Sequence, residues 1–135
     1  MTEIKIFNPD GIYRPKSPYM QVTRARGSEF AFIAGQVPVD TTGKVVGEGD
    51  FEAQCAQVFR NIATALGSVG ADWSNVVQFT SYVTRVEDLS AFTSWRAREF
   101  PSMFKNREFP PNTLLVINRL AEAAFLLEVQ TIAVL

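Results

Sequence analysis

The sequence predicts one α+β domain over residues 1–135, with two helices covering one face of a mixed sheet. Its 135 residues, 47% of them hydrophobic, suffice for one core and hardly for two domains. Segments of strand length stand before, between and after two helical segments, and a strand–helix–strand unit implies a crossover with some parallel pairing. The second face of such a sheet stays open, so apolar residues on it need burial against another subunit. An α+β oligomer is therefore expected.

The first half of the chain is predicted to contain a loop, two strands and a turn. Residues 8–18 carry the Asn, Gly and Pro residues of an ordered loop. A strand is possible over residues 19–26. The continuous apolar run at residues 30–34 is typical of a strand that is buried on both faces. Residues 41–44 indicate a turn, and Val45-Val46 a short return strand.

The clearest pattern is a helix over residues 51–69, where apolar residues recur at steps of three and four. Its apolar face consists of Phe51, Cys55, Val58, Phe59, Ile62, Leu66 and Val69. Asp50 suits the N-cap, and Gly70 suits the residue that ends the helix. Cys55 belongs to this face, which favours a small buried residue over a catalytic thiol.

The second half predicts a strand over residues 76–84, a helix from residues 87–88, and strands over residues 113–118 and 125–134. Pro101 is expected to end or kink that helix.

Three residues of the second helix allow two interpretations. Trp95 with Arg96 and Arg98 could stack and hold a nucleobase. The sequence favours core packing for Trp95 and a solvated face for both arginines.

Composition excludes several classes of function. There is no His and one Cys, which excludes a His-dependent triad, a Cys–His dyad, a Cys/His zinc site and an internal disulfide. No metal or cofactor is expected. Thirteen basic and 14 acidic residues give a net charge of −1, which argues against nucleic-acid or membrane binding. The chain shows no signal or membrane-spanning pattern, so a soluble cytoplasmic protein is expected.

Glu128 is a carboxylate in an otherwise apolar strand. Strand alternation places it on one face together with Leu126, Gln130 and Ile132. An edge position, or an ion pair with Arg119 or Arg24, is the structural interpretation. The functional interpretation is a carboxylate that holds or deprotonates a water molecule.

The sequence allows two roles for Gly35 and two for Tyr19. Gly35 follows an apolar strand, where a glycine either lets a ligand approach the backbone or forms a bulge or turn. Tyr19 follows Pro18 at the start of a strand, where its hydroxyl lines a pocket or its ring simply packs.

Five stretches together resemble the reactive intermediate deaminase (Rid, formerly YjgF) family. They are Ser17–Gln21, Phe32–Asp40, Gln54–Ala71, Phe109–Thr113 and Glu128–Val134. The resemblance extends over nearly the whole chain, in order and with matching spacing.

This resemblance implies a chorismate-mutase-like α+β fold and a homotrimer. Three sheets would line a central barrel, with small-molecule pockets in the clefts between subunits. In deaminating members an arginine clamps the substrate carboxylate, a glutamate positions the attacking water, and a tyrosine and a backbone N–H complete the site. The reaction hydrolyses an enamine or imine, such as 2-aminoacrylate, to a 2-keto acid and ammonia without metal or cofactor.

When the functional residues of the family are carried over position by position, the resemblance implies that Tyr19 and Glu128 are catalytic and that Gly35 binds the ligand. Two further pocket positions depart from the family pattern. Ala34 stands where a serine is usual, and Thr93 where an asparagine is usual.

Asn112 occupies the position of the clamping arginine, which resembles the arginine-lacking Rid subgroups; its alternative role is a turn residue before a strand. A charged hydrogen bond contributes about 1.5–3 kcal/mol and a neutral one about 0.5–1.5 kcal/mol. The amide should therefore weaken carboxylate binding by about one or two decades, which argues against the usual deaminase activity. Arg14, Lys16 and Arg119 are candidates for the missing charge.

Two functions stay open: a hydrolase of an enamine, imine or related metabolite, and a non-catalytic module that binds a metabolite or a protein. The net charge and the absence of His and of a basic stripe argue against a ribonuclease.

Overall fold

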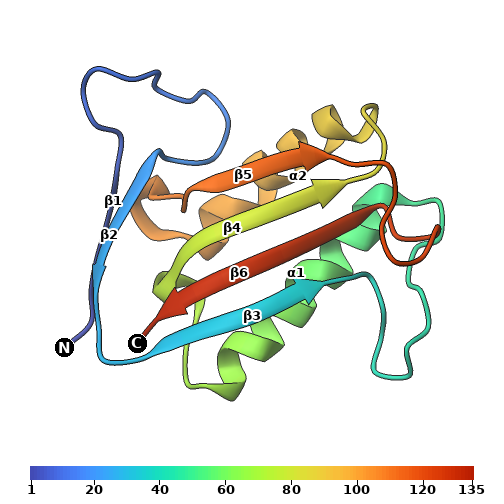
Figure 1. The fold of residues 1–135 in the computed structure, drawn as a ribbon, viewed down its shortest axis with the longest axis horizontal. Coiled ribbons are helices and arrows are strands. Elements are labelled where there is room, and N and C mark those ends of the chain that lie inside the picture. The colour runs from blue at the N-terminus through green and yellow to red at the C-terminus, as the bar shows by residue number, and fades with distance from the viewer.

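The computed structural model describes residues 1–135 as a four-stranded mixed sheet, a two-stranded hairpin and two helices (Figure 1). The main sheet has the order β3 (Phe30–Gln36), β6 (Leu127–Val134), β4 (Val76–Val83) and β5 (Asn112–Val116). Strand β6 is antiparallel to both β3 and β4, whereas β4 and β5 are parallel.

Both helices lie on the same face of this sheet, as the sequence predicts (Figure 1). They are α1 (Phe51–Ser68) and α2 (Asp88–Met103), and two short 3₁₀ helices follow them, η1 (Trp73–Asn75) and η2 (Lys105–Arg107). Helix α2 makes the crossover between the parallel strands β4 and β5. Neither α1 nor α2 is long and apolar enough to cross a membrane.

The N-terminal strands form a sheet of their own, which the sequence analysis did not foresee. Strand β1 (Glu3–Phe7) pairs antiparallel with β2 (Val22–Arg26), so the structure has two sheets rather than one. A hydrogen bond of 2.8 Å from Thr23 Oγ1 to the Val77 carbonyl links the hairpin to β4. Strand β2 is shorter than predicted because residues 19–21 still belong to the connecting loop.

Helix α1 confirms the predicted caps. Asp50 Oδ1 accepts a hydrogen bond of 3.1 Å from the Ala53 N–H, and Gly70 has a φ of +72°, a conformation that suits glycine at a helix end. Val69 lies beyond the last helical residue and is exposed, so its expected place on the buried face was wrong. Cys55 is fully buried, and this burial raises the pKa of its thiol, which fits a structural role.

The core between the sheet and the helices is built around Phe59. Its ring lies 4.9 to 6.5 Å from those of Trp73, Phe79, Phe92, Trp95 and Phe100. Trp95 is therefore a core residue, as predicted. Arg96 contradicts its prediction: only 3% of it is exposed, because its turn of α2 faces the protein interior.

Pro101 does not end α2, contrary to expectation. It lies in the last turn, where a missing N–H removes a single helical hydrogen bond, and the helix continues to Met103. The Phe104 N–H then donates to the Phe100 carbonyl at 2.9 Å.

Strand β3 is buried on one face only, so the prediction from its apolar run was wrong. Ile33 points into the core, but Phe30 is 61% and Phe32 74% exposed, because no layer of the chain covers that face. The predicted return strand at residues 45–46 is reduced to a single bridge between Val39 and Val45, whereas the turn at residues 41–44 is confirmed.

Candidate functional site

The candidate site is a shallow depression on the open face of the main sheet, with a volume of about 260 Å³. It is lined by Gly35, Tyr82, Ile117, Leu120, Glu128 and Gln130. These residues come from strands β3, β4 and β6 and from the segment after β5, so the depression lies across the middle of the sheet.

Glu128 is the one acidic residue of this depression, and it lies on the central strand β6. Its neighbour across the sheet is Tyr82 on β4. The predicted edge position is therefore wrong. No arginine or lysine nitrogen lies within 4.0 Å of the Glu128 carboxylate, so the expected ion pair is also absent. Glu128 is a half-buried carboxylate that the fold leaves without a cationic partner.

The two arginines considered as partners point elsewhere. The Arg119 guanidinium donates hydrogen bonds to the carbonyls of Leu120 at 3.0 Å and Ala121 at 3.1 Å. Arg24 lies on β2 and lines a separate cavity with Glu3 and Lys5. Arg119 thus supports the loop beside the depression and does not place its charge in it.

Gly35 and Glu128 are in close contact. A Cβ atom added to Gly35 would lie 2.7 Å from Glu128 Cδ and 2.8 Å from Cγ, closer than such atoms can approach. The pairing of β3 with β6 is interrupted between Ile33 and Gln36, so Gly35 lies in a β-bulge. The bulge interpretation is confirmed, and the absent side chain makes room for the carboxylate.

Polar side chains of α1 hold the two strands that carry this contact. Gln54 is fully buried; its Nε2 donates to the carbonyls of Gly47 and Ala124, and its Oε1 accepts from the Leu126 N–H at 2.8 Å. Asn61 Nδ2 donates to the carbonyls of Val37 and Val39, just after β3, at 3.1 and 3.0 Å. Helix α1 therefore fixes the start of β6 and the end of β3 from beneath.

Asn112 lies away from Glu128 within the chain. It begins β5 opposite Phe79, while Glu128 lies opposite Tyr82, a separation of three residues or about 10 Å along β4. Its Oδ1 accepts a hydrogen bond of 2.7 Å from the hydroxyl of Ser81, which is buried under the helix layer. The Asn112 side chain is thus engaged on the other face of the sheet.

The remaining predicted residues are distributed around the chain. Ala34 is exposed on β3 beside Gly35, so it stays near the depression. Thr93 lies on α2, behind the sheet. Tyr19 lines a different cavity, formed with the loop at residues 14–20 and with residues next to η2. A single chain therefore brings together Gly35, Ala34 and Glu128, but not Tyr19 or Thr93.

Three residues that line the depression were not predicted as site residues: Tyr82, Ile117 and Leu120. Alternation along residues 76–84 places Tyr82 on the face opposite to Val83, but nothing in that pattern shows that β4 pairs with β6. Ile117 falls inside the strand predicted over residues 113–118, but β5 ends at Val116, and Leu120 belongs to the irregular segment that follows. In this chain, no three His, Cys, Asp or Glu residues lie close enough to hold a metal ion.

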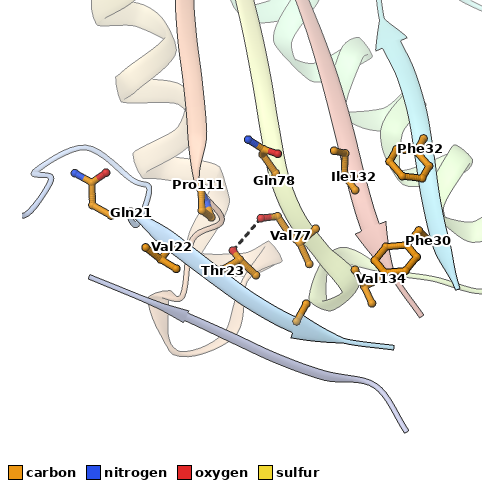
Figure 2. Close-up of a pocket in the computed structure, with 11 residues that line it drawn as sticks. Gln21, Val22, Thr23, Phe30, Phe32, Val77, Gln78, Pro111, Ile132 and Val134 are labelled. Carbon is orange, nitrogen blue, oxygen red and sulfur yellow. Dashed lines mark hydrogen bonds between the residues drawn. The ribbon is translucent and has the colours of Figure 1, made fainter. Parts of the chain in front are cut away.

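A larger apolar cavity of about 520 Å³ separates the hairpin from the open face of the sheet. Figure 2 shows Phe30 and Phe32 on one side of it and Val22 and Thr23 of β2 on the other. The two phenylalanine rings stack with their centroids 6.5 Å apart. The predicted uncovered apolar face is thus present in the chain.

Comparison with known proteins agrees with this architecture. A family model described as endoribonuclease L-PSP matches residues 12–135. A RutC family protein of Synechocystis is 32% identical over 122 residues, covering 90% of this chain and 88% of the relative. A RutC family protein of Pyrococcus horikoshii is 31% identical over 121 residues, covering 89% of both chains.

Solved structures give the same result. The Rid family protein YyfB of Yersinia pestis superposes with a TM-score of 0.85 at 26% identity, over 98% of each chain. With the family model matching nearly the entire fold and relatives above 30% identity along most of their length, this chain belongs to the Rid/YjgF family and has its chorismate-mutase-like α+β fold.

Proposed function

We propose that this protein is a hydrolase of a small enamine, imine or related metabolite, assembled as a homotrimer with its sites between copies. The observation that carries the proposal is Glu128, a half-buried carboxylate on a central strand that has no cationic partner. A carboxylate that contributes no ion pair to the fold is available to bind water. Family membership supports a small-molecule role.

The Glu128 carboxylate accepts a hydrogen bond from a water molecule and turns its oxygen lone pair toward the C=N carbon of the substrate. The C–O bond forms to the carbon of the protonated imine as the carboxylate takes one proton of the water, which gives a neutral carbinolamine. Glu128 then gives this proton to the amino group and takes the hydroxyl proton as the C–N bond breaks, so that a carbonyl compound and ammonia leave, and ammonia carries the last proton away as ammonium. No electrons are gained or lost, so the sequence needs no redox cofactor.

A neighbouring copy completes the site in this proposal. The depression around Glu128 is open in the single chain, and Tyr19, Thr93 and Asn112 lie elsewhere. The exposed rings of Phe30 and Phe32 favour a second copy seated on the same face. Tyr19 of that copy would orient the substrate by its hydroxyl beside the Glu128 carboxylate.

Asn112 sets the preferred substrate within this proposal. It takes the place of the clamping arginine of the deaminating members, as in the arginine-lacking subgroup. Its amide N–H can donate one neutral hydrogen bond where a guanidinium donates two charged ones. We therefore expect 2-aminoacrylate to be a weak substrate and less acidic analogues to be better ones.

The first experiment measures ammonia release from enzymatically generated 2-aminoacrylate by the natural protein, Glu128→Gln and Asn112→Arg. Glu128→Gln keeps the shape that fills the space over Gly35 and removes the base, so turnover should fall about 10²–10⁴-fold. Glu48→Gln, an exposed position outside the depression, is the matched control. Asn112→Arg should raise turnover if the rest of the site is intact. Equal rates for Glu128→Gln and the natural protein would disprove the role of Glu128.

The bond between Ser81 and Asn112 favours a second candidate, a binding module without catalysis. This bond engages the Asn112 carbonyl oxygen in the fold, so the position is fixed without any substrate. Calorimetry against a panel of metabolites, paired with turnover assays, separates the two functions. A ligand that binds and is not turned over by the natural protein supports the module.

A further inference from the structure

A groove on the helix layer is lined by both tryptophans of the chain. It has a volume of about 320 Å³ and lies between α1, η1 and the second half of α2. The chain contains two Trp residues, and both of them, Trp73 and Trp95, line this groove. Figure 1 shows the helices behind the main sheet, so the groove is separate from the depression at Glu128 on the open face. It belongs to a part of the molecule that the proposed hydrolysis does not use.

The lining of the groove is mostly aromatic and apolar. Phe59 is 4% and Trp95 7% exposed, whereas Trp73 and Met103 are half-buried. The ring centroids of Phe59 and Trp95 lie 4.9 Å apart, and those of Phe59 and Trp73 lie 6.1 Å apart. Rings that are fixed by one another in this way form a rigid surface on which a flat aromatic ligand packs well. The thioether of Met103 also makes favourable contacts with aromatic rings.

Small side chains on α1 leave room for such a ligand. Ala56 and Ala63 line the groove together with Phe59, because residues three and four positions apart are neighbours on a helix surface. Ala63 is exposed, so the groove opens to solvent on its side. The volume of the groove is in the range of small-molecule sites.

One cation at the groove has no counter-charge. Arg60 lines the groove, and no carboxylate oxygen lies within 4.0 Å of its nitrogens. Glu99 also lines the groove, but its carboxylate lies 3.3 Å from Arg98 Nε and so has a cationic partner already. The Arg60 Nη1 donates a hydrogen bond of 2.7 Å to Oε1 of Gln57, a buried residue. Because this bond holds the guanidinium in place, an anion that binds it loses less affinity to side-chain ordering.

We propose that this groove binds a small aromatic carboxylate, a molecule with one flat ring, one acid group and no positive charge. The ring packs against Trp73, Trp95 and Phe59. The acid group pairs with the Arg60 guanidinium, whose donors match the two oxygens of a carboxylate. Charge complementarity at Arg60 therefore selects an acid over a neutral or basic molecule with the same ring. The site is complete in one chain and does not depend on the proposed hydrolysis.

The test is isothermal titration calorimetry of the natural protein with phenylacetate and with three probes that each lack one feature of it. Phenylethanol lacks the charge, phenylethylamine has the opposite charge, and acetate lacks the ring. We expect phenylacetate to bind about tenfold or more tightly than each of the three. Absence of phenylacetate binding at millimolar concentration, or binding of phenylethanol or acetate as tight as that of phenylacetate, would overturn the proposal.

The intrinsic fluorescence of the protein locates the ligand. Because both tryptophans line the groove, phenylacetate that binds there should change the tryptophan emission, with the same midpoint as the calorimetric titration. The phenyl ring does not absorb at the wavelengths that excite tryptophan selectively, so the change reports on the protein alone. Heat of binding without any change in tryptophan emission would place the ligand elsewhere and refute the assignment.

Variants of Arg60 test the charge pairing. Arg60→Gln changes an exposed residue and should weaken phenylacetate binding about tenfold with little change in melting temperature. Arg60→Lys keeps the charge and should retain more of the affinity. Arg26→Gln, an exposed arginine of β2 outside the groove, is the matched control and should bind phenylacetate as the natural protein does. Unchanged binding by Arg60→Gln would refute the pairing.

A second pair of variants tests the shape of the groove. Ala63→Leu places a larger side chain in the groove at an exposed position, so it should abolish phenylacetate binding without unfolding the chain. Thr64→Leu makes a similar change at the next exposed residue of α1, which does not line the groove, and should leave binding intact. Full binding by Ala63→Leu would refute this location.

Two variants separate this proposal from the proposed hydrolysis. Glu128→Gln should lose turnover and keep phenylacetate binding, whereas Arg60→Gln should lose phenylacetate binding and keep turnover. Turnover that depends on Glu128 without any phenylacetate binding refutes the groove site alone. Phenylacetate binding with turnover unaffected by Glu128→Gln refutes the hydrolase alone.

Discussion

The two faces of the main sheet differ in how completely their side chains are packed and paired. The face under the helices is closed, with Phe59 in contact with five other aromatic rings and Gln54 using both ends of its amide. The open face carries exposed Phe30 and Phe32 and the unpaired carboxylate of Glu128. The covered face forms the hydrophobic core of the chain. The open face carries two aromatic rings and a carboxylate that make no stabilising contact of this kind within the single chain.

Removing a ring from the covered face should have the largest effect. Phe59→Ala leaves a cavity among the surrounding aromatic side chains, and we expect the free energy of unfolding to fall by about 3–5 kcal/mol. Phe59→Leu fills most of that space and should cost less than about 1.5 kcal/mol. Urea denaturation followed by tryptophan fluorescence measures both. Equal losses for the two variants would contradict this explanation and show that the aromatic ring itself, and not the volume that it fills, stabilises this core.

Charge on the open face should act on assembly and not on the fold of the chain. Phe32→Asp places a carboxylate where the proposed trimer buries an aromatic ring, which we expect to weaken association by about 2–4 kcal/mol. Sedimentation equilibrium should show three copies for the natural protein and a shift toward one copy for the variant. Glu48→Gln, on the exposed loop, should leave the mass unchanged. A natural protein that sediments as one copy would contradict the assembly.

The contact between Gly35 on β3 and Glu128 on β6 allows a more specific test of the open face. In Gly35→Ala the added methyl group occupies the space of the Glu128 carboxylate, so the carboxylate must move. Because water positioning depends on that carboxylate, turnover should fall about tenfold or more, equivalent to about 1.4 kcal/mol. The matched control is Gly67→Ala on α1, where an added Cβ meets open space. Full activity in Gly35→Ala would show that the contact between Gly35 and Glu128 does not contribute to catalysis.

What the sequence could predict follows the same division. Helix α1 and its caps were predicted because the apolar spacing of residues 51–69 and the Asp50 N-cap are local signals. The open sheet face was predicted from the number of helices. Strand alternation placed Glu128 beside Gln130, and both line the depression.

The features that the sequence did not predict depend on contacts between distant segments. Tyr82 meets Glu128 through strand pairing, and the Asn112 side chain meets Ser81 across 31 positions. The burial of Arg96 results from the packing of α2, which its exposed neighbour Arg98 does not share. An apolar run such as that of β3 indicates burial but not which partner provides it, so it was mistaken for a strand covered on both faces within the chain.

The smallest expected effect concerns the loop that leads from β3 to α1. The Asp40 carboxylate accepts hydrogen bonds from the Thr42 hydroxyl and from the backbone N–H groups of Thr42 and Lys44, which lower the pKa of Asp40 below its ordinary value. A lowered folded-state pKa means that the charged carboxylate stabilises the fold above the unfolded-state pKa of about 4, and that this contribution is lost as the pH falls through the folded-state value.

Asp40→Asn keeps the shape and removes the charge, so the variant should melt slightly below the natural protein at pH 7 and converge with it below about pH 3. Thermal unfolding from pH 2.5 to pH 7 measures this, with Asp10→Asn, an exposed loop residue, as the control. A difference that persists unchanged at pH 2.5 would mean that the loop depends on the shape of the side chain and not on its charge, which would place this loop with the covered face, where packing and neutral hydrogen bonds determine stability.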